Sequence, residues 1–493
     1  MYQETRFRYF FPVALCAGAF LATSCVQPLG PGFRFIDRQT EIRAVPDAPR
    51  GPGLHVRVAD RFNNAGNRPL HSLEARLPEG PTFGSQNLRV TVDGREVSPQ
   101  RVNDADRRLM RAPFDPVWEQ HQPREIITEW DWMSEPAGRG TVAASAEAFY
   151  IADETALPLW QTPTGVFARG GPDPVDSNLT VVAPPDYRVL APGKPLKPGT
   201  VGNLVAHRFK IRPKEDFLPY VVAGRYLEQK PRTPQVEVSF WTLQPLDGQQ
   251  AQTAAARLAS SMQAYMDFFG PASKSKTAVY IVEAPGDLPA EFGEPGDAGS
   301  GSFPGGVLLD RRALTQGVAN ESILELAEYE LARTWFGWRV MPASEDQILM
   351  GRGVGLYGLI LAAEGRGPDE RNRMVALLLE RYDEARRIAA DRRLLEPPAG
   401  YSRAERISTG YRAALFFAAL EDLCGRDNLR SAFRRIVRVR AGDEVAHEEL
   451  RAAVEAASQR DLAEMFRTWL NHSGIPDEFR SRYSNPPGTR SGN

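Results

Sequence analysis

The balance between strand-like and helix-like segments changes near residue 236 of this 493-residue chain. Before that point the sequence has short alternating segments, such as Leu88–Val92, which ends at an Asp93-Gly94 turn signal. From residue 319 onward, apolar residues recur at the spacing of amphipathic helices almost without interruption. Runs of strands followed by runs of helices indicate an α+β protein with more than one domain.

The segments can be placed along the chain. Strands are expected in the first part at 54–58, 88–92, 126–130 and 179–183, forming an antiparallel β domain. A mixed region follows, with strands at 236–241, 277–282 and 307–309, a helix at 249–269, and a loop rich in Gly, Pro and Asp over 285–306. Helices are expected at 319–336, 344–363, 368–392, 405–423, 427–440 and 446–471.

Composition excludes few classes of protein. The formal net charge is −2, with 42% hydrophobic and 25% charged residues, which is ordinary for a globular protein. Nothing in this balance indicates a nucleic-acid partner. A length of 493 residues allows two to four domains.

The N-terminus resembles a bacterial lipoprotein signal. Arg6 and Arg8 precede an apolar run, Tyr9–Ala22, and small residues lead to Cys25. The resemblance implies cleavage after residue 24 and lipidation of Cys25, hence a membrane anchor on the bacterial cell envelope. Val26 after the cysteine favours the outer membrane, facing the periplasm. The alternative is an ordinary secretory signal in which the cysteine is incidental.

One helical stretch carries a specific motif. Residues 327–337 read Ala-Glu-Tyr-Glu-Leu-Ala-Arg-Thr-Trp-Phe-Gly. They resemble the zinc helix of the M1 aminopeptidase (gluzincin) family, His-Glu-Leu-Ala-His-Gln-Trp-Phe-Gly. The family's third ligand comes from a later Glu-Gly-x-Ala-x-Tyr pattern, and residues 352–357, Arg-Gly-Val-Gly-Leu-Tyr, stand at the family spacing. The resemblance extends over about 236–477 and implies a thermolysin-like domain after the β domain.

The residues that would hold the metal differ from the family pattern. In such a helix two histidines four residues apart face one zinc ion, a third ligand completes the set, and a glutamate acts as general base. The resemblance places Tyr329, Arg333 and Arg352 at the three ligand positions, and only the base position, Glu330, keeps the family residue. Neither arginine has a lone pair to offer a metal.

Electrostatics argues against any divalent ion at these positions. A unit charge 4 Å from a dication interacts with it by about 8 kcal/mol at an effective dielectric near 20, and here the interaction is repulsive. Arg333 and Arg352 are therefore expected to replace the metal's charge, pairing with Glu330 as a buried carboxylate requires. No metal and no cofactor is expected.

Two further positions bear on catalysis. The resemblance places Tyr411 where the family has a tyrosine that stabilises the oxyanion, near a helix start. Without a metal, packing at a domain junction is the favoured interpretation of Tyr411. Residues 299–306, Gly-Ser-Gly-Ser-Phe-Pro-Gly-Gly, stand where the family has an edge strand with an amine-binding glutamate. That glutamate is missing, and a flexible loop is expected instead.

The resulting domain prediction divides the whole chain. It comprises a signal peptide at 1–24, a tether at 25–50, a β domain at 51–235, an M1 peptidase-like domain at 236–400, its C-terminal helices at 401–480 and a disordered tail at 481–493.

The expected function is a catalytically inactive, lipid-anchored peptidase homologue that binds peptide or protein through the inherited cleft. Three alternatives stay open. The first is a hydrolase with non-standard chemistry, built from Glu330, Tyr411 and arginines that could hold a carboxylate or phosphate. The second is a metallo-aminopeptidase with an unrecognised metal site. The third is a purely structural envelope protein whose cleft is filled.

Overall fold

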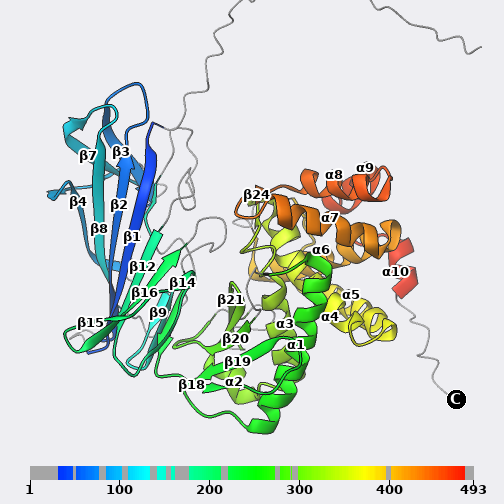
Figure 1. Cartoon of the computed structure of the whole chain (residues 1–493). Coiled ribbons are helices and arrows are strands. Elements are labelled where there is room, and N and C mark those ends of the chain that lie inside the picture. The colour runs from blue at the N-terminus through cyan, green and yellow to red at the C-terminus, as the bar shows by residue number, and fades with distance from the viewer. Residues whose placement is uncertain are drawn as a thin grey trace, which may run out of the picture.

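The predicted α+β architecture is confirmed. The computed structural model shows a β-rich region beside a second region, in which a mixed sheet is followed by a bundle of helices (Figure 1). It describes residues 32–47, 51–76, 85–102, 109–133, 142–151, 157–160, 177–211, 220–272, 278–288, 290, 298–395 and 401–483.

A nine-stranded sheet dominates the first region. Its order is β14-β16-β12-β1-β2-β8-β4-β5, with β15 also paired to β16. Neighbouring strands are antiparallel except for the parallel pair β1 and β12. The strands are β1 (Arg34–Val45), β2 (Gly53–Asn63), β4 (Ser85–Val92), β5 (Arg95–Val97), β8 (Pro123–Met133), β12 (Ser177–Ala183), β14 (Lys194–Pro195), β15 (Gly199–Val201) and β16 (Leu204–Ile211).

The tether predicted for residues 25–50 is wrong over much of its length. Strand β1 occupies Arg34–Val45 in the middle of the large sheet. Thr40, Ile42 and Ala44 are buried at every second position, as a strand with one face on the core requires. The Pro and Gly residues that suggested a linker lie on either side of this strand.

Two four-stranded sheets complete the β-rich region. One has the order β13-β17-β10-β9 and the other β11-β3-β7-β6. Each shares a hydrophobic cluster with the nine-stranded sheet, so both pack on it. The strands are β3 (Leu70–Arg76), β6 (Gln100–Arg101), β7 (Leu109–Trp118), β9 (Val142–Ala144), β10 (Ala148–Ile151), β11 (Leu159–Trp160), β13 (Arg188–Leu190) and β17 (Val221–Gly224).

The second region begins with a five-stranded sheet of order β18-β19-β20-β22-β21. Strands β19, β20 and β22 are parallel, and the two edge strands are antiparallel to their neighbours. The elements are β18 (Leu227–Gln229), β19 (Glu237–Thr242), β20 (Ala278–Glu283), β21 (Ser300–Phe303), β22 (Gly306–Leu309), α1 (Gly248–Phe269), α2 (Arg311–Gln316) and α3 (Glu321–Ala332).

The loop expected over 299–306 is instead a β-hairpin. Strand β21 pairs with β22, and the turn between them contains Gly305, whose φ is +79°. A positive φ favours glycine, so this glycine serves a tight turn rather than flexibility. Ser302 and Phe303 are buried, which fixes the hairpin on the sheet.

The remaining elements are predominantly helical. They are β23 (Met341–Pro342), the 3₁₀ turn η2 (Ser344–Asp346), the π-helical turn η3 (Gln347–Gly353), α4 (Val354–Glu364), α5 (Pro368–Ile388), α6 (Arg403–Cys424), α7 (Arg426–Val439), β24 (Glu444–Val445), α8 (His447–Ser458), α9 (Ala463–Asn471) and α10 (Asp477–Tyr483). Among the described residues, none of the helices has the length and hydropathy needed to cross a membrane.

Two helix boundaries correct the sequence prediction. The single helix expected over 446–471 is two helices, α8 and α9, separated at Gln459 in the left-handed conformation. Helix α10 runs to Tyr483, into the segment expected to be a disordered tail from residue 481. Cys25 and residues 484–493 lie outside the described residues.

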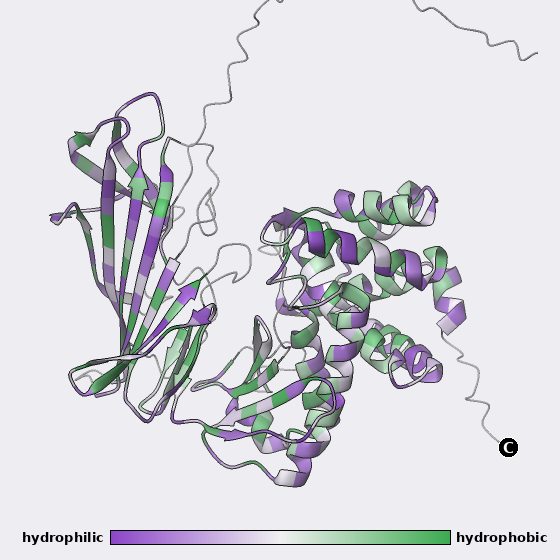
Figure 2. Ribbon diagram, in the orientation of Figure 1, coloured by the Kyte–Doolittle hydropathy of each residue, from purple (hydrophilic) through white to green (hydrophobic). Residues whose placement is uncertain are grey.

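A shared core joins the two regions. Tyr150 and Tyr220 from the β-rich region belong to the same buried cluster as Trp241, Phe303 and Trp338 from the second region. The Tyr220 and Phe303 rings stack with centroids 5.0 Å apart. In Figure 2, hydrophobic and hydrophilic residues alternate along the long strands, as two-faced sheets require.

Candidate functional site

Helix α3 carries two of the four positions on which the zinc motif depends. Asn320 caps its start by accepting a hydrogen bond from the Ser322 backbone N–H. The helix packs between the β21–β22 hairpin and helices α1 and α4. Tyr329 and Glu330 are both buried, so α3 presents these side chains to the protein interior.

The Glu330 carboxylate is enclosed by two hydrogen-bond donors. Ser300 Oγ donates to Glu330 Oε1 at 2.7 Å, and Arg333 donates to Glu330 Oε2 at 3.0 Å. The expected ion pair between Glu330 and Arg333 is therefore present. Each carboxylate oxygen of a fully buried side chain has a donor, as burial of a charge requires. Ser300 was not anticipated, because its strand was expected to be a loop.

Tyr329 and Arg333 fill the space beside this carboxylate. The Arg333 guanidinium lies 5.6 Å from the centre of the Tyr329 ring, in cation–π range. Helix α4 passes so close that a Cβ on Gly355 would lie 2.6 Å from Tyr329 and 2.9 Å from Arg333. Because Gly355 has no side chain, the Tyr329 ring and the Arg333 side chain can pack directly against helix α4.

Arg352 lies on the π-helical turn η3, against helix α6. A Cβ at Gly410 would come within 2.7 Å of the Arg352 Cδ and Nε atoms. On the same turn, a Cβ at Gly353 would lie 2.6 Å from the Ala413 side chain. Two glycines therefore allow Arg352 to pack directly on α6. That Arg352 also joins Glu330 stays a prediction.

The donor set at these positions does not fit a divalent metal. A zinc site of this type needs three ligands with free lone pairs and an open position for water. Here two of the three positions hold guanidinium groups, which offer none. Glu330 is already held by Ser300 and Arg333.

Tyr411 is not at a helix start, contrary to the sequence prediction. Helix α6 begins eight residues earlier, at Arg403, with a capping box formed by Ser402 and Glu405. Tyr411 is 5% exposed and lines a cavity. Burial raises the pKa of Tyr411, and the charges of Arg381 and Arg352 lower it in part. Its phenol therefore stays protonated near neutral pH and can donate a hydrogen bond.

The cavity has a volume of about 760 Å³. Its apolar walls come from helices α3, α4, α5 and α6 and include Ile323, Leu326, Leu356, Leu359, Ile388 and Ile407. Its charged lining residues are Glu325, Arg381, Glu384 and Arg403. A largely apolar space with a few polar groups is typical of a ligand site.

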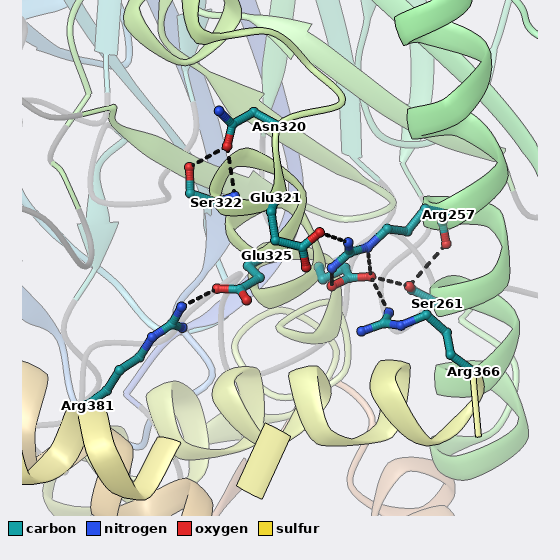
Figure 3. A network of polar contacts seen from close by, with 9 residues as sticks. Arg257, Ser261, Asn320, Glu321, Ser322, Glu325, Arg366 and Arg381 are labelled. Atoms are coloured by element: carbon teal, nitrogen blue, oxygen red, sulfur yellow. Dashed lines mark hydrogen bonds and ion pairs between the residues drawn. The ribbon is translucent and has the colours of Figure 1, made fainter. Parts of the chain in front are cut away.

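One ion pair spans the side of this cavity. Arg381 of α5 lies 2.8 Å from Glu325 of α3, as Figure 3 shows. Arg403 donates to the backbone carbonyl of Ala290 at 2.8 Å. Tyr411 was singled out from the sequence, but the charged lining residues Glu325, Arg381, Glu384 and Arg403 were not, because their helices are far apart along the chain and meet only in the fold.

A second buried network holds α3 against α1. Arg257 donates two hydrogen bonds of 2.9 Å to the fully buried Glu328 carboxylate, and Ser261 adds another of 2.6 Å. Arg366 approaches the same carboxylate at 3.4 Å (Figure 3). Bidentate pairing fixes direction as well as distance, so this network orients the helix that carries Glu330.

Asp346, His447 and Glu448 form another cluster. Within the described part of the chain, their ligand atoms lie close enough together to hold a metal ion. Asp346 is buried and accepts a hydrogen bond from the His447 backbone N–H at 2.8 Å. The His447 ring lies between the two carboxylates, with Nδ1 2.9 Å from Asp346 and Nε2 3.2 Å from Glu448. Burial lowers the pKa of His447, but these carboxylates outweigh it, and the net pKa is raised. This arrangement suits an imidazolium ion.

Comparison with known proteins identifies the fold. No family model and no curated sequence matches this chain. Among solved structures, the M1 zinc metallopeptidase from Deinococcus radiodurans superposes with a TM-score of 0.64, covering 93% of this chain and 97% of that one at 16% identity. The fold is that of an M1 zinc metallopeptidase.

Related solved structures agree with this assignment. A glutamate-to-alanine mutant of the Deinococcus enzyme, bound to a Tyr-Ser-Ala substrate, gives a TM-score of 0.65 at 17% identity over 93% of this chain and 98% of that one. A two-domain M1 zinc metallopeptidase mutant bound to L-arginine gives 0.64 at 17% identity with the same coverage. At this identity the M1 likeness concerns the fold alone.

Proposed function

We propose that this chain is a non-catalytic M1-type peptidase homologue of the bacterial cell envelope, anchored by lipid at Cys25, which binds peptide in the cavity beside the former metal site. The proposal depends on the side chains that occupy the positions of the zinc motif. Arg333 and Ser300 hold the Glu330 carboxylate, and Tyr329 fills the neighbouring space. A glutamate held in this way is not available as a base toward water.

Peptide binding is supported by the cavity itself. A volume of about 760 Å³ with mostly apolar walls accommodates a short peptide with apolar side chains. Mutants of similar M1 structures were solved with a Tyr-Ser-Ala substrate and with single amino acids. No side chain of the described residues fills this cavity, which argues against a purely structural role.

Metal content and turnover test this proposal. The purified protein is expected to contain no stoichiometric zinc by elemental analysis and to leave aminoacyl fluorogenic substrates intact, because its ligand positions hold Tyr329, Arg333 and Arg352. One equivalent of bound zinc, together with hydrolysis of these substrates that disappears in Glu330→Gln, would contradict the proposal that the protein is non-catalytic.

The Asp346–His447–Glu448 cluster allows a second candidate, a metalloprotein with a different centre, in which a metal ion would take the place of the ring proton of His447. None of its ligands comes from α3 or α4, so it would not use Glu330. The same elemental analysis separates the two candidates. Metal retained by the wild-type protein and lost in His447→Gln would favour the metalloprotein.

A further inference from the structure

The outer edge of the nine-stranded sheet is rich in basic residues. Between residues 187 and 211 the sequence has five Lys and Arg residues and no Asp or Glu. Lys194, Lys197 and Arg208 of this segment are exposed to solvent. Within the described part of the chain, no carboxylate lies within ion-pair distance of any of these three side chains. Their positive charges are therefore not offset by a neighbouring acid.

Exposed apolar side chains lie on the same face of this edge. The backbone N–H of Leu196 donates to the Arg208 carbonyl at 2.8 Å, so the two residues are opposite each other and share a face, as does Lys194. Val201 pairs with Leu204, which is four residues before Arg208 on β16 and therefore on the same face. Leu196 is 44% exposed and Val201 39%. We call Lys194, Leu196, Lys197, Val201 and Arg208 the edge patch.

The edge patch is unsuited to the addition of another strand. Pro195 and Pro198 interrupt the outer strand, and proline has no backbone N–H to donate to a neighbour. A partner must therefore contact the side chains. Cations interleaved with exposed aliphatic groups suit an anionic surface with an apolar interior, which is the chemistry of a bilayer that contains anionic lipids.

The edge patch begins at the end of the sheet from which the chain leads back to Cys25. Ser177 of β12 pairs with both Arg38 of β1 and Ile211 of β16, so the start of β1 and the end of β16 lie at one end of the sheet. Lys194 pairs one residue before the end of β16. Strand β14 is three strands from β1, or about 15 Å at a strand spacing of about 4.8 Å (Figure 1). A bilayer that held a lipid on Cys25 would therefore be within reach of this edge.

We propose that the edge patch binds the anionic headgroups of a lipid bilayer, with Leu196 and Val201 at the boundary between headgroups and acyl chains. The inference rests on the proposed location at the cell envelope. Each basic residue near an anionic surface strengthens binding by about fivefold, so Lys194, Lys197 and Arg208 together give roughly a hundredfold preference for anionic over neutral bilayers. Such binding is reversible, and it orients an anchored protein rather than holding it on the membrane.

Co-sedimentation with lipid vesicles tests the edge patch on the chain from residue 26 onward, which keeps every described residue and lacks Cys25. This chain is expected to bind vesicles of phosphatidylcholine mixed with phosphatidylglycerol, and to bind pure phosphatidylcholine roughly a hundredfold more weakly. High salt should remove the difference, because it screens charges at the surface. Lys194→Gln, Lys197→Gln and Arg208→Gln combined should remove most of the binding to the mixed vesicles.

Three exposed arginines of the helical region provide a matched control. Arg387→Gln, Arg435→Gln and Arg438→Gln combined change the net charge by the same amount and should leave vesicle binding unchanged. The comparison of vesicles and the salt dependence use the unsubstituted chain, so they decide the question even where a variant unfolds.

Several results would overturn the bilayer proposal. They are equal binding to both kinds of vesicle, no binding to either, and an equal loss in the two triple variants. Binding to soluble polyglutamate without binding to vesicles would also overturn it, because it would indicate an acidic protein as the partner. Each of these results leaves peptide binding in the cavity and lipidation of Cys25 as separate questions, since neither depends on the edge patch.

Discussion

Glu330 is a buried carboxylate whose two oxygens both have hydrogen-bond donors. In the M1-type motif this position is a general base, yet here its two oxygens accept hydrogen bonds from Ser300 and Arg333. Arg333 in turn lies over the Tyr329 ring, and Gly355 leaves room for both. The ion pair between Glu330 and Arg333 therefore helps to pack the end of helix α3 against its neighbours.

Replacing Glu330 with glutamine should destabilise the protein. Glutamine keeps the shape but removes the charge, so the bond to Arg333 loses its ionic character in a buried place. Loss of such a bond costs about 1–3 kcal/mol, which chemical denaturation resolves. Glu464→Gln is a matched control, because Glu464 pairs with Arg467 at the same three-residue spacing but on the surface. An unchanged melting temperature for Glu330→Gln would show that charge replacement is not the function of this pair.

The sequence predicted this residue-scale pairing but not its surroundings. The spacing of Glu330 and Arg333 on a helix is enough to bring the two side chains together. Ser300 comes from a strand 30 residues earlier, and only the fold of the β21–β22 hairpin brings it to α3. Partners that depend on tertiary contacts carry no local signal.

At the scale of elements, helices were predicted better than strands. Helix α1 was expected at 249–269 and spans Gly248–Phe269, because the apolar period that predicted it is a local signal. Strand β1 was missed, since Pro and Gly residues flank it on both sides. The break between α8 and α9 at Gln459 was also missed, because a left-handed residue other than glycine has no reliable sequence signal.

The segment before η3 is fastened to the start of α8 by His447. Met341–Pro342 pairs with Glu444–Val445, and the Asp346 carboxylate then contacts both the backbone and the ring of His447. Glu345 and Glu448 add negative charge around the same ring. The protonated imidazole thus joins two segments far apart in sequence, next to the turn that carries Arg352.

The stabilisation from His447 should depend on pH. The pKa of His447 is raised in the folded protein, so the folded state binds the proton more tightly than the unfolded chain. Its contribution to the unfolding free energy is fully present below about pH 6.5, the ordinary histidine value, and is lost as pH rises through the raised pKa. Urea titrations from pH 5.5 to 8.5 should show His447→Gln most destabilised at low pH. The exposed His472→Gln serves as control, and a pH-independent deficit would refute the argument.

For the molecule as a whole, the β-rich region and the helical region form one connected structure. Tyr150 and Tyr220 share a buried cluster with Phe303, whose strand also supplies Ser300 to Glu330. The packing of the β-rich region thus supports the hairpin that holds the Glu330 carboxylate. The sequence predicted two regions of this kind but not the core between them, because strands β10 and β17 lie far in sequence from the residues they contact.

The position of β1 constrains how an anchored molecule would be held. Since β1 starts at Arg34, eight residues separate it from Cys25, and a fully extended chain of that length spans at most about 29 Å. A lipid on Cys25 would therefore keep the β-rich region close to the membrane. Cys25→Ser is expected to move the protein from the membrane fraction to the soluble fraction on cell fractionation, because it removes the side chain that we propose carries the lipid. Cys16→Ser, a change within the expected signal peptide, should leave it with the membrane. Membrane association of both variants would mean that the protein is held by something other than this lipid.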